Sequence, residues 1–521
     1  MERKNAKREQ IFHLLEEAGA LTPDVARAVA AQTGVPEADV WGAARFYTLL
    51  TGHDVGLRVC QGLTCKIAGS DALAADLTTR GIPHEQVSCL GQCDRAPVAV
   101  DEELRVLHAG ADRGAVTPDN PDLPINLGGA DDASYAALAK ARSIGPEAVL
   151  DELEAAGLQG RGGAGFPAHF KWRSVRSQAV AERYIVCNAD EAEPGTFKDR
   201  ETMLRRPHRV LEGLAIAALV AEATAIYIYV RGEFPTERES LERAMGEAGE
   251  ALAGFDFRFV AGHGAYICGE ETALIESIEG RRGMPRLKPP FPTEVGLFGK
   301  PTLMNNVETL ACVPSILLRG GAWFRAQGRT EPGSKLYCIS GHIERPGVYE
   351  LPLGATLDEL VEVAGGYVGT PMAFSPGGAS SGFLPMSHRD TPLDFKGLPA
   401  ADSMLGSAGV VVLNDTVDMA HAAREQAVFF EDESCGQCAP CRIGTRVVRR
   451  ALDRYLASGS TDAFKYLDDV AWEMEEGSIC GLGMVAAWPL TTAKKHFPEH
   501  FGPRDISSTV SSTVSSSKEQ P

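Results

Sequence analysis

The first stretch of the chain has the hydrophobic spacing of short helices. Thr22 can cap a helix, Pro23 suits its first position, and Val25 and Val29 fall on one helical face. The elements predicted next are a helix, a strand, a helix and two short strands, at about 36–50, 57–59, 70–79, 87 and 98–100. This order of helices and strands predicts a compact α/β module.

The middle of the chain has the pattern of a parallel α/β sheet. From about 135 to 330, helical stretches alternate with apolar, β-rich runs at 184–186, 225–230 and 257–260. One of the helices is predicted at 146–158.

The C-terminal part changes character. Residues 335–340 and 347–350 read as strands, and Thr356 with Glu359 has the spacing of a capping box, so we predict a small α+β domain. Residues 420–500 have a mostly helical pattern. The fold class is therefore multidomain α/β. The predicted segments are an N-terminal module, a linker, an α/β domain, an α+β domain, a helical domain and a disordered tail, at 1–117, 118–134, 135–330, 331–420, 421–503 and 504–521.

Charge and composition disfavour several classes of protein. The 521 residues carry a formal net charge of −19, and such a surface repels nucleic acids and anionic membranes. No run approaches the roughly 18 to 20 apolar residues of a membrane span. The charged N-terminus is not followed by the apolar core of a signal peptide. We therefore expect a cytoplasmic protein with no membrane insertion and no nucleic-acid partner.

Eight of the 12 cysteines form two clusters, which without a secretory signal favour metal ligation over disulfides. In the first cluster, Cys60, Cys65, Cys89 and Cys93 can converge from two loops that follow short strands. Four thiolates fit either a 2Fe-2S cluster or a tetrahedral zinc. The remaining cysteines lie singly in apolar surroundings and read as small buried hydrophobic residues: Cys187, Cys268, Cys312 and Cys338.

The second cysteine cluster has a more specific spacing. Cys435, Cys438 and Cys441 form C-x2-C-x2-C, and Cys480 lies farther along the chain. Three thiolates at intervals of three residues can hold three corners of a cube while a distant fourth closes it, which is typical of a 4Fe-4S cluster. A structural zinc is the alternative.

Polar and glycine-rich loops indicate a binding cleft. The loop 160–167 contains G-x-G-x-x-G, but a predicted helix precedes it, so an ordinary Rossmann turn is not expected. Its glycines let backbone N–H groups approach an anion or a flat ring. Polar loops at 188–200 and 264–272 follow predicted strands, and 286–292 and 305–306 are similarly polar. Because ligands bind beyond the carboxyl ends of parallel strands, we expect these loops to converge.

The N-terminal module resembles the thioredoxin-like 2Fe-2S subunit of complex I. The resemblance rests on the segments LTP at 21–23, VWGAARFYT at 40–48, RVC at 58–60 and CLGQCDRAP at 89–97. It implies that the first four cysteines bind a 2Fe-2S cluster. Only 23 residues separate Cys65 from Cys89, fewer than the family usually has, which leaves open how the cluster is shielded.

Residues from about 145 to 500 resemble the NADH-binding FMN flavoprotein subunit of complex I. The motifs that carry this resemblance are GRGGAGFP, NADEAEPGTFKDR, GAYICGEET and RLKPPFP. The resemblance places around FMN the residues Gly160, Gly163, Lys171, Asn188, Asp190, Glu191, Gly269, Glu270, Asn305 and Asn306. It places against the dinucleotide the residues Gly162, Phe166, Glu193, Glu271, Lys288 and Phe291. Arg161 and Gly165, in the same glycine-rich loop, complete the expected cofactor-binding set.

The same resemblance implies a Rossmann-like FMN and NADH domain, a ubiquitin-like β-grasp domain and a helical 4Fe-4S domain. Lys171 and Lys288 can offset phosphate charge, and aromatic side chains can stack on the nucleotide. Two positions depart from the family. Ser174 stands where many members have a second stacking phenylalanine, and Ala192 replaces a usual glycine, so we expect weaker adenine stacking.

Fusion of both modules in one chain resembles the β subunit of NAD-dependent formate dehydrogenases. The implied function is that FMN exchanges hydride with NAD(H) and single electrons with the iron-sulfur clusters. In this way, electrons from formate oxidation reduce NAD+. The implied partner is a molybdopterin- and iron-sulfur-containing catalytic subunit, with a small separate 2Fe-2S subunit as a further candidate. Alternatives are the diaphorase subunit of an NAD-reducing or bifurcating hydrogenase, a complex I-like NADH-oxidising flavoprotein, and a non-catalytic iron-sulfur scaffold.

Overall fold

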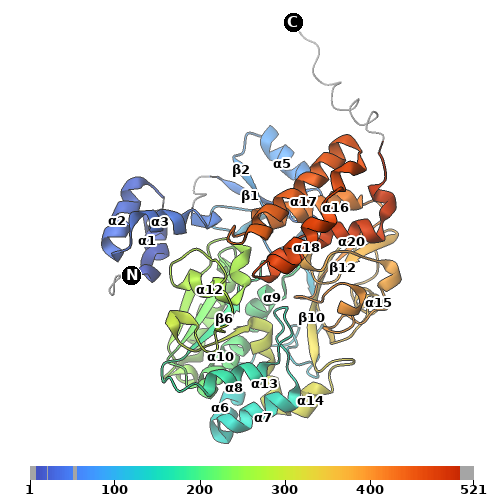
Figure 1. The fold of residues 1–521 in the computed structure, drawn as a ribbon. Coiled ribbons are helices and arrows are strands. Elements are labelled where there is room, and N and C mark those ends of the chain that lie inside the picture. The colour runs from blue at the N-terminus through green and yellow to red at the C-terminus, as the bar shows by residue number, and fades with distance from the viewer. Residues whose placement is uncertain (1–6, 20, 51–54, 505–521) are drawn as a thin grey trace.

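The computed structural model describes residues 7–19, 21–50 and 55–504. The predicted disordered tail lies outside these residues from position 505 onward. Within the described ranges, no helix is both long and apolar enough to cross a membrane. The chain folds into modules arranged around one central region, with the N-terminal helices at one side and the C-terminal helices above (Figure 1).

The N-terminal module is the predicted α/β unit. Its sheet has the order β2-β1-β3-β4, in which β1 and β2 are parallel and the other pairs are antiparallel. Thr22 caps α2 by accepting a hydrogen bond from the Val25 N–H, as predicted. The strands are β1 Leu57–Cys60, β2 His84–Val87, β3 Val98–Val100 and β4 Val106–Ala109. The helices are α1 Ile11–Ala18, α2 Pro23–Thr33, α3 Glu37–Ala44, α4 Leu63–Ile67 and α5 Ser70–Thr79.

The helix predicted at 36–50 is shorter in the structure, because α3 ends at Ala44. Beyond it, the Tyr47 ring is fully buried and packs edge-on against Phe12 at 4.9 Å and against His263 at 5.8 Å. The Tyr47 hydroxyl donates to the Arg281 carbonyl oxygen. These contacts to a distant segment replace the final turns of the helix.

The central domain contains a four-stranded parallel sheet in the order β8-β7-β6-β9. Three of these strands were predicted, whereas β9 was not recognised. Asn188 at the end of β6 pairs in register with Asn306 at the end of β9, which brings two of the polar loops together. The strands are β6 Tyr184–Ala189, β7 Ala225–Val230, β8 Phe257–Ala261 and β9 Thr302–Asn306. The helices are α6 Ala136–Ile144, α7 Pro146–Ala156, α8 Ala168–Arg176, α9 Lys198–Arg205, α10 Pro207–Ala221, α11 Pro235–Ala248, α12 Glu271–Ile278, α13 Val307–Arg319 and α14 Gly321–Arg325.

The segment expected to form the β-grasp domain, about 331–420, contains most of a mixed six-stranded sheet with the order β13-β12-β14-β10-β11-β5. The predicted capping box is present: Thr356 accepts from the Glu359 N–H, and Glu359 accepts from the Thr356 N–H. Strand β5 comes from before the linker and pairs in parallel with β11. The elements are β5 Ala115–Val116, β10 Ser334–Gly341, β11 Gly347–Pro352, α15 Leu357–Val363, β12 Pro371–Ser375, β13 Leu384–Pro385 and β14 Gly409–Asn414.

The C-terminal region is helical, as predicted, and lies across the top of the molecule in red (Figure 1). One continuous apolar core joins Ile11 of the N-terminal helices, Val186 of the central sheet and Phe430 of this region. The modules are therefore packed into one body and not strung on linkers. The helices are α16 Met419–Asp432, α17 Ala439–Ser458, α18 Leu467–Gly477, α19 Gly481–Val485 and α20 Trp488–His496.

Candidate functional site

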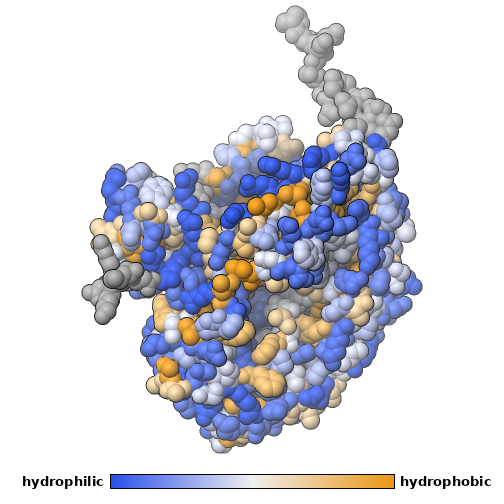
Figure 2. All heavy atoms as spheres, viewed as in Figure 1, coloured by the Kyte–Doolittle hydropathy of each residue, from blue (hydrophilic) through white to orange (hydrophobic). Residues whose placement is uncertain are grey.

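A deep cavity opens at the carboxyl ends of β6 and β9, where the space-filling view shows a hollow in the middle of the face (Figure 2). Its larger part has a volume of about 840 Å³, within the range of a ligand pocket. Its inner part lies between the central sheet, the β-grasp loops and Cys480.

The predicted cofactor-binding residues converge on this cavity with one exception. The residues that line it are Gly160, Gly162, Gly163, Gly165, Phe166, Lys171, Asn188, Asp190, Glu191, Glu193, Gly269, Glu270, Glu271, Lys288, Phe291, Asn305 and Asn306. Arg161 does not line it. Its side chain is fully buried, donates to the Pro332 carbonyl oxygen at 2.8 Å and lies over the Phe324 ring. Arg161 thus anchors the glycine-rich loop to the segment that enters the β-grasp domain.

The glycine-rich loop follows helix α7, as predicted, and packs closely on its surroundings. A Cβ atom at Gly162 would lie 2.9 Å from the Asn306 side chain. Gly165 has a φ of +63°, and a Cβ there would lie 2.9 Å from the Phe395 ring. Both positions therefore need glycine for the loop to pack against Asn306 and Phe395. The loop also lines the cavity, where its backbone can approach a flat or anionic ligand, which fits FMN.

Acidic and basic side chains pair along one wall of the cavity. Lys171 contacts Glu271 at 2.8 Å, and Lys288 contacts both Glu270 and Glu271 at 2.8 and 2.9 Å. Although burial alone would raise it, the two lysines lower the pKa of Glu271 to about 2. The lysines expected to offset phosphate charge are therefore partly neutralised already by these carboxylates.

The floor of the cavity is held by buried charges at the start of α9. The Glu191 carboxylate accepts from the Asp199 and Arg200 N–H groups at 2.8 and 3.0 Å. Lys198 pairs with Asp199 at 2.8 Å and with Glu308 at 3.2 Å. Burial raises the pKa of Glu191. A carboxylate at a helix N-terminus is favoured by the helix dipole, so this arrangement stiffens the loop that carries Asn188 and Asp190.

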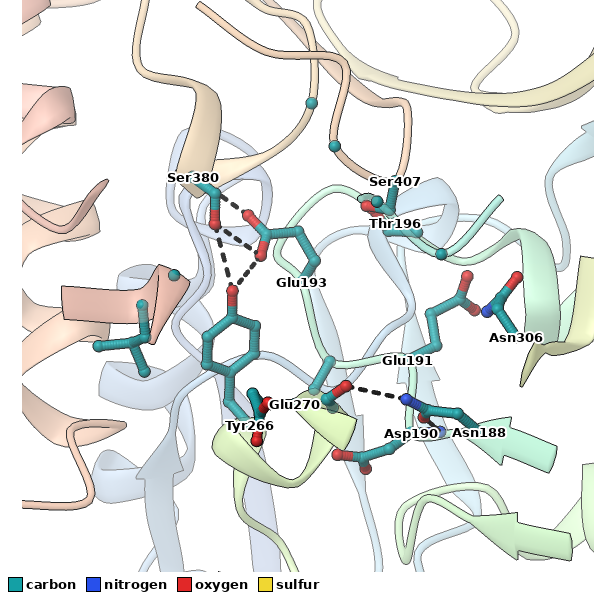
Figure 3. A pocket seen from close by; sticks show the side chains of 18 of the residues that line it. Asn188, Asp190, Glu191, Glu193, Thr196, Tyr266, Glu270, Asn306, Ser380 and Ser407 are labelled. Atoms are coloured by element: carbon teal, nitrogen blue, oxygen red, sulfur yellow. Dashed lines mark hydrogen bonds between the residues drawn. The ribbon is translucent and has the colours of Figure 1, made fainter. Parts of the chain in front are cut away.

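Glu193 is held by two side chains that the sequence did not single out. The Tyr266 hydroxyl donates to Glu193 at 2.5 Å, and Ser380 donates to it through both its hydroxyl and its N–H (Figure 3). Burial raises the pKa of Glu193. Ser380 lies in a short 3-10 helix of the β-grasp domain, η7 Ala379–Ser381, 187 positions from Glu193, and no local pattern in the sequence links the two.

Three exposed phenylalanines line the outer part of the cavity. Phe166 and Phe291 were predicted to contact the dinucleotide and are 56% and 50% exposed. Phe170 was not predicted, yet it is 59% exposed and lies one helical turn before Ser174 on α8, where both residues line the cavity. The spacing of Phe170 and Ser174 by four residues is the signal that could have found it.

The first cysteine set converges as predicted. All four thiols are free and buried, and the Cys89 and Cys93 sulfur atoms lie 3.9 Å apart. A Cβ at Gly62 would lie 3.7 Å from both the Cys60 and the Cys89 sulfur. The Cys60 thiol and burial raise the pKa of Cys89 to about 12. Four buried, free thiols brought together in this way are a donor set suited to an iron-sulfur cluster.

The central domain shields this cysteine set. Arg200 donates to the Gly91 carbonyl, to Gln92 and to both oxygens of Asp94, and Arg231 donates to the Cys89 carbonyl. Although burial alone would raise it, Arg200 lowers the pKa of Asp94. The shielding that the short Cys65–Cys89 spacing left open therefore comes from the neighbouring domain.

The second cysteine set gathers at the start of α17 and α19. The Ser434 hydroxyl lies 3.3 Å from the Cys441 sulfur, and a Cβ at Gly483 would lie 2.8 Å from the Cys441 Cβ. Burial raises the pKa of Cys441 to about 12 and that of Cys480 to about 11. The other three thiols of the set add to the shift of Cys441, and Cys435 adds to that of Cys480. Cys480 also lines the cavity beside the glycine-rich loop. This thiol is thus shared between the cluster site and the cavity wall.

The remaining cysteines are buried and free, as predicted, and lie outside both sets: Cys187, Cys268, Cys312 and Cys338.

Family models match most of the chain. Residues 153–315 match the Nuo51 FMN-binding domain, and residues 421–504 match the NADH-ubiquinone oxidoreductase-F iron-sulfur binding region. Residues 1–108 match a thioredoxin-like [2Fe-2S] ferredoxin, and residues 336–384 match an SLBB domain. The order of these matches follows the order of the modules in the structure.

Known proteins match over long stretches. The second NADH-quinone oxidoreductase F subunit of Rhizobium meliloti (strain 1021) is 46% identical over 386 residues, which cover 70% of this chain and 91% of that protein. The NADH-quinone oxidoreductase F subunit of Mycobacterium bovis is 45% identical over 385 residues, covering 70% of this chain and 86% of that protein.

Solved structures match the whole architecture. A chain in a crystal structure of an air-oxidized NAD+-reducing [NiFe]-hydrogenase has a TM-score of 0.89 at 30% identity and covers 97% of this chain and 95% of its own. A chain in a crystal structure of an NAD+-reducing [NiFe]-hydrogenase in the H2-reduced state has a TM-score of 0.89 at 29% identity, and the match covers 99% of each chain. These matches span the N-terminal module as well as the flavin and cluster domains.

Proposed function

Since this chain belongs to the family of NADH-quinone oxidoreductase F subunits, we propose that it is the diaphorase subunit of a formate-oxidising complex that reduces NAD+. The chain is an NADH-dehydrogenase-type subunit with FMN-binding, 2Fe-2S and 4Fe-4S domains. We propose that formate is the source of its electrons.

One observation supports the diaphorase role most directly. Cys480 lines the same cavity as the glycine-rich loop, Glu193 and Glu270. A nucleotide site and an iron-sulfur ligand therefore share one wall, which keeps the distance for electron transfer short.

The chain's own residues position the reactants. When bound, FMN supplies the hydride and single-electron chemistry. The glycine-rich loop and the cavity floor around Glu191 form a surface that can bind a flat ring and its phosphate. The phenylalanines at the mouth offer apolar faces to the nucleotide, and Glu193 offers a carboxylate to its hydroxyls.

The electron source has two candidates. Formate oxidation by a molybdopterin-containing subunit is supported by the resemblance of the fused chain to formate dehydrogenase β subunits. Hydrogen oxidation is supported by the structural match, since the matched chain of the NAD+-reducing [NiFe]-hydrogenase extends over nearly the whole of this one. Both candidates require a partner that exchanges single electrons with this chain.

The co-purified complex separates the candidates. We expect formate-dependent NAD+ reduction and molybdenum or tungsten in the preparation, because the proposed partner is a molybdopterin-containing subunit that oxidises formate. Hydrogen-dependent NAD+ reduction together with nickel in the complex would show instead that hydrogen is the electron source. Metal analysis and assays of formate-dependent and hydrogen-dependent NAD+ reduction distinguish the two.

Phe170 provides a test of nucleotide binding. Replacing Phe170 by alanine is expected to raise the KM for NADH about tenfold, because stacking of a base on an aromatic ring contributes roughly 1–3 kcal/mol. Steady-state assays with NADH and with reduced nicotinamide mononucleotide, which has no adenine, make the comparison. The shorter substrate should react equally well with parent and variant. Ser174→Phe should lower the KM for NADH, and an unchanged KM in Phe170→Ala would rule out stacking on this ring.

A further inference from the structure

Glu433 lies where three functional parts of the chain meet. It is the C-terminal cap of α16 and stands two residues before Cys435 in the loop of the second cysteine set. One carboxylate oxygen accepts from the Ser88 hydroxyl at 2.6 Å, and the other accepts from the Tyr266 N–H at 2.9 Å. Ser88 is the neighbour of Cys89 in the first cysteine set, and Tyr266 holds Glu193 in the cavity.

The position of this carboxylate is costly for the helix that carries it. A negative charge at the C-terminal end of a helix meets the negative end of the helix dipole. Helix α16 gains nothing from Glu433, so the reason for an acidic residue here lies in the two groups that it binds.

Tyr266 is held from two sides by the end of α16. Its ring packs edge-on against Phe429 with centroids 5.0 Å apart, and its N–H is held by Glu433. Its hydroxyl is then aimed at Glu193 and Ser380. A change at Glu433 would therefore move the Tyr266 backbone and, through its hydroxyl, the Glu193 carboxylate.

We infer that Glu433 is a positioning residue that fixes the nucleotide loop at Tyr266 and the 2Fe-2S loop at Ser88 to the start of the 4Fe-4S loop. The inference rests on the proposed diaphorase function, because it gives the three loops a shared task. It assigns to one side chain the relative placement of the substrate site and both cluster loops. Neither the cysteine spacing nor the glycine-rich motif includes this residue.

Three substitutions separate the hydrogen bond of Glu433 to Tyr266 from its hydrogen bond to Ser88. Glu433→Ala removes both hydrogen bonds and is expected to raise the KM for NADH about tenfold while kcat with a small dye changes less than about twofold, since a lost hydrogen bond to a charged group has an effect of this size. Ser88→Ala removes only the hydrogen bond to the 2Fe-2S loop. It should change the line shape of the 2Fe-2S electron paramagnetic resonance signal without changing the KM for NADH. Glu433→Gln should restore KM, because its amide oxygen can still accept from Tyr266 and its NH2 group can donate to Ser88.

The matched control is Glu431→Gln, at the same end of α16. Glu431 pairs with Arg446 and Arg449 on α17. Within the described part of the chain, no hydrogen bond or ion pair given for Glu431 reaches the nucleotide or 2Fe-2S loops. This variant should leave KM and the 2Fe-2S signal as in the parent protein. An equal rise of KM in Glu431→Gln would show that general loosening of α16 causes the effect, and it would overturn the inference.

Amide hydrogen exchange gives a readout that needs no bound cofactor. Glu433→Ala should speed exchange in the peptides that contain Tyr266 and Ser88, and Ser88→Ala only in the second. If Glu433→Ala leaves both peptides protected as in the parent, the inference fails even if the protein is a diaphorase. If the parent protein lacks flavin and shows no NADH-to-dye activity, the proposed function fails, while the exchange result still decides whether Glu433 positions the loops.

Discussion

Replacing Cys438 by serine is expected to abolish electron transfer from NADH to the partner complex while leaving part of the NADH-to-dye activity. Cys438 is the N-cap of α17 and one of the four thiols of the second set. Serine is a poor ligand for iron in such a cluster, so the 4Fe-4S signal should disappear. Because loss of groups that only support metal ligands already costs 10- to 100-fold, we expect at least about a hundredfold loss of partner reduction. The cavity stays intact, so small dyes can still accept electrons directly.

The control for this variant is Cys312→Ala. Cys312 is fully buried on α13, outside both cysteine sets, and burial raises the pKa of its thiol to about 12. Its loss should leave partner reduction and the resonance signals unchanged. Parent-like reduction of partner clusters by Cys438→Ser would show that electrons do not pass through the second cysteine set.

Replacing Glu193 by glutamine is expected to improve kcat/KM for NADPH relative to NADH by at least about an order of magnitude, or about 1.4 kcal/mol. A carboxylate can accept hydrogen bonds from ribose hydroxyls, but it repels a 2′-phosphate, and such like-charge contacts typically cost several kcal/mol. Glutamine keeps the size of the side chain and can still accept from the Ser380 N–H, so the loop should stay in place. Steady-state kinetics with both nucleotides measures the ratio, and the flavin content should not change.

Ser380→Ala tests whether charge or placement determines the preference. It removes one hydroxyl contact to Glu193 and keeps the carboxylate. We expect both nucleotides to weaken together, with the ratio nearly that of the parent. An unchanged NADPH/NADH ratio in Glu193→Gln would show that this residue only positions its loop.

Local chemistry explains why so much of the fold could be predicted. Thr22 and the pair Thr356 and Glu359 cap their helices through partners three residues away. Strands β6 and β7 are buried on both faces, so each reads as a continuous apolar run. Strand β9 was missed because its last residues, Asn305 and Asn306, carry polar side chains into the cavity wall.

The sequence by itself determined the chemistry of this protein: two sets of thiols, a glycine-rich loop after a helix and polar loops after parallel strands. These signals depend on spacing within one loop or on the alternation of a single strand. Tertiary structure alone decided which groups share a site. The contacts of Glu193 with Ser380 and of Ser88 with Glu433 join residues 187 and 345 positions apart. Arg161 lies in the chain between two residues that line the cavity, Gly160 and Gly162, but its side chain donates to the Pro332 carbonyl oxygen instead. Such partners are selected by the packing of whole domains, because a buried polar group must find a hydrogen bond wherever the fold brings one within reach.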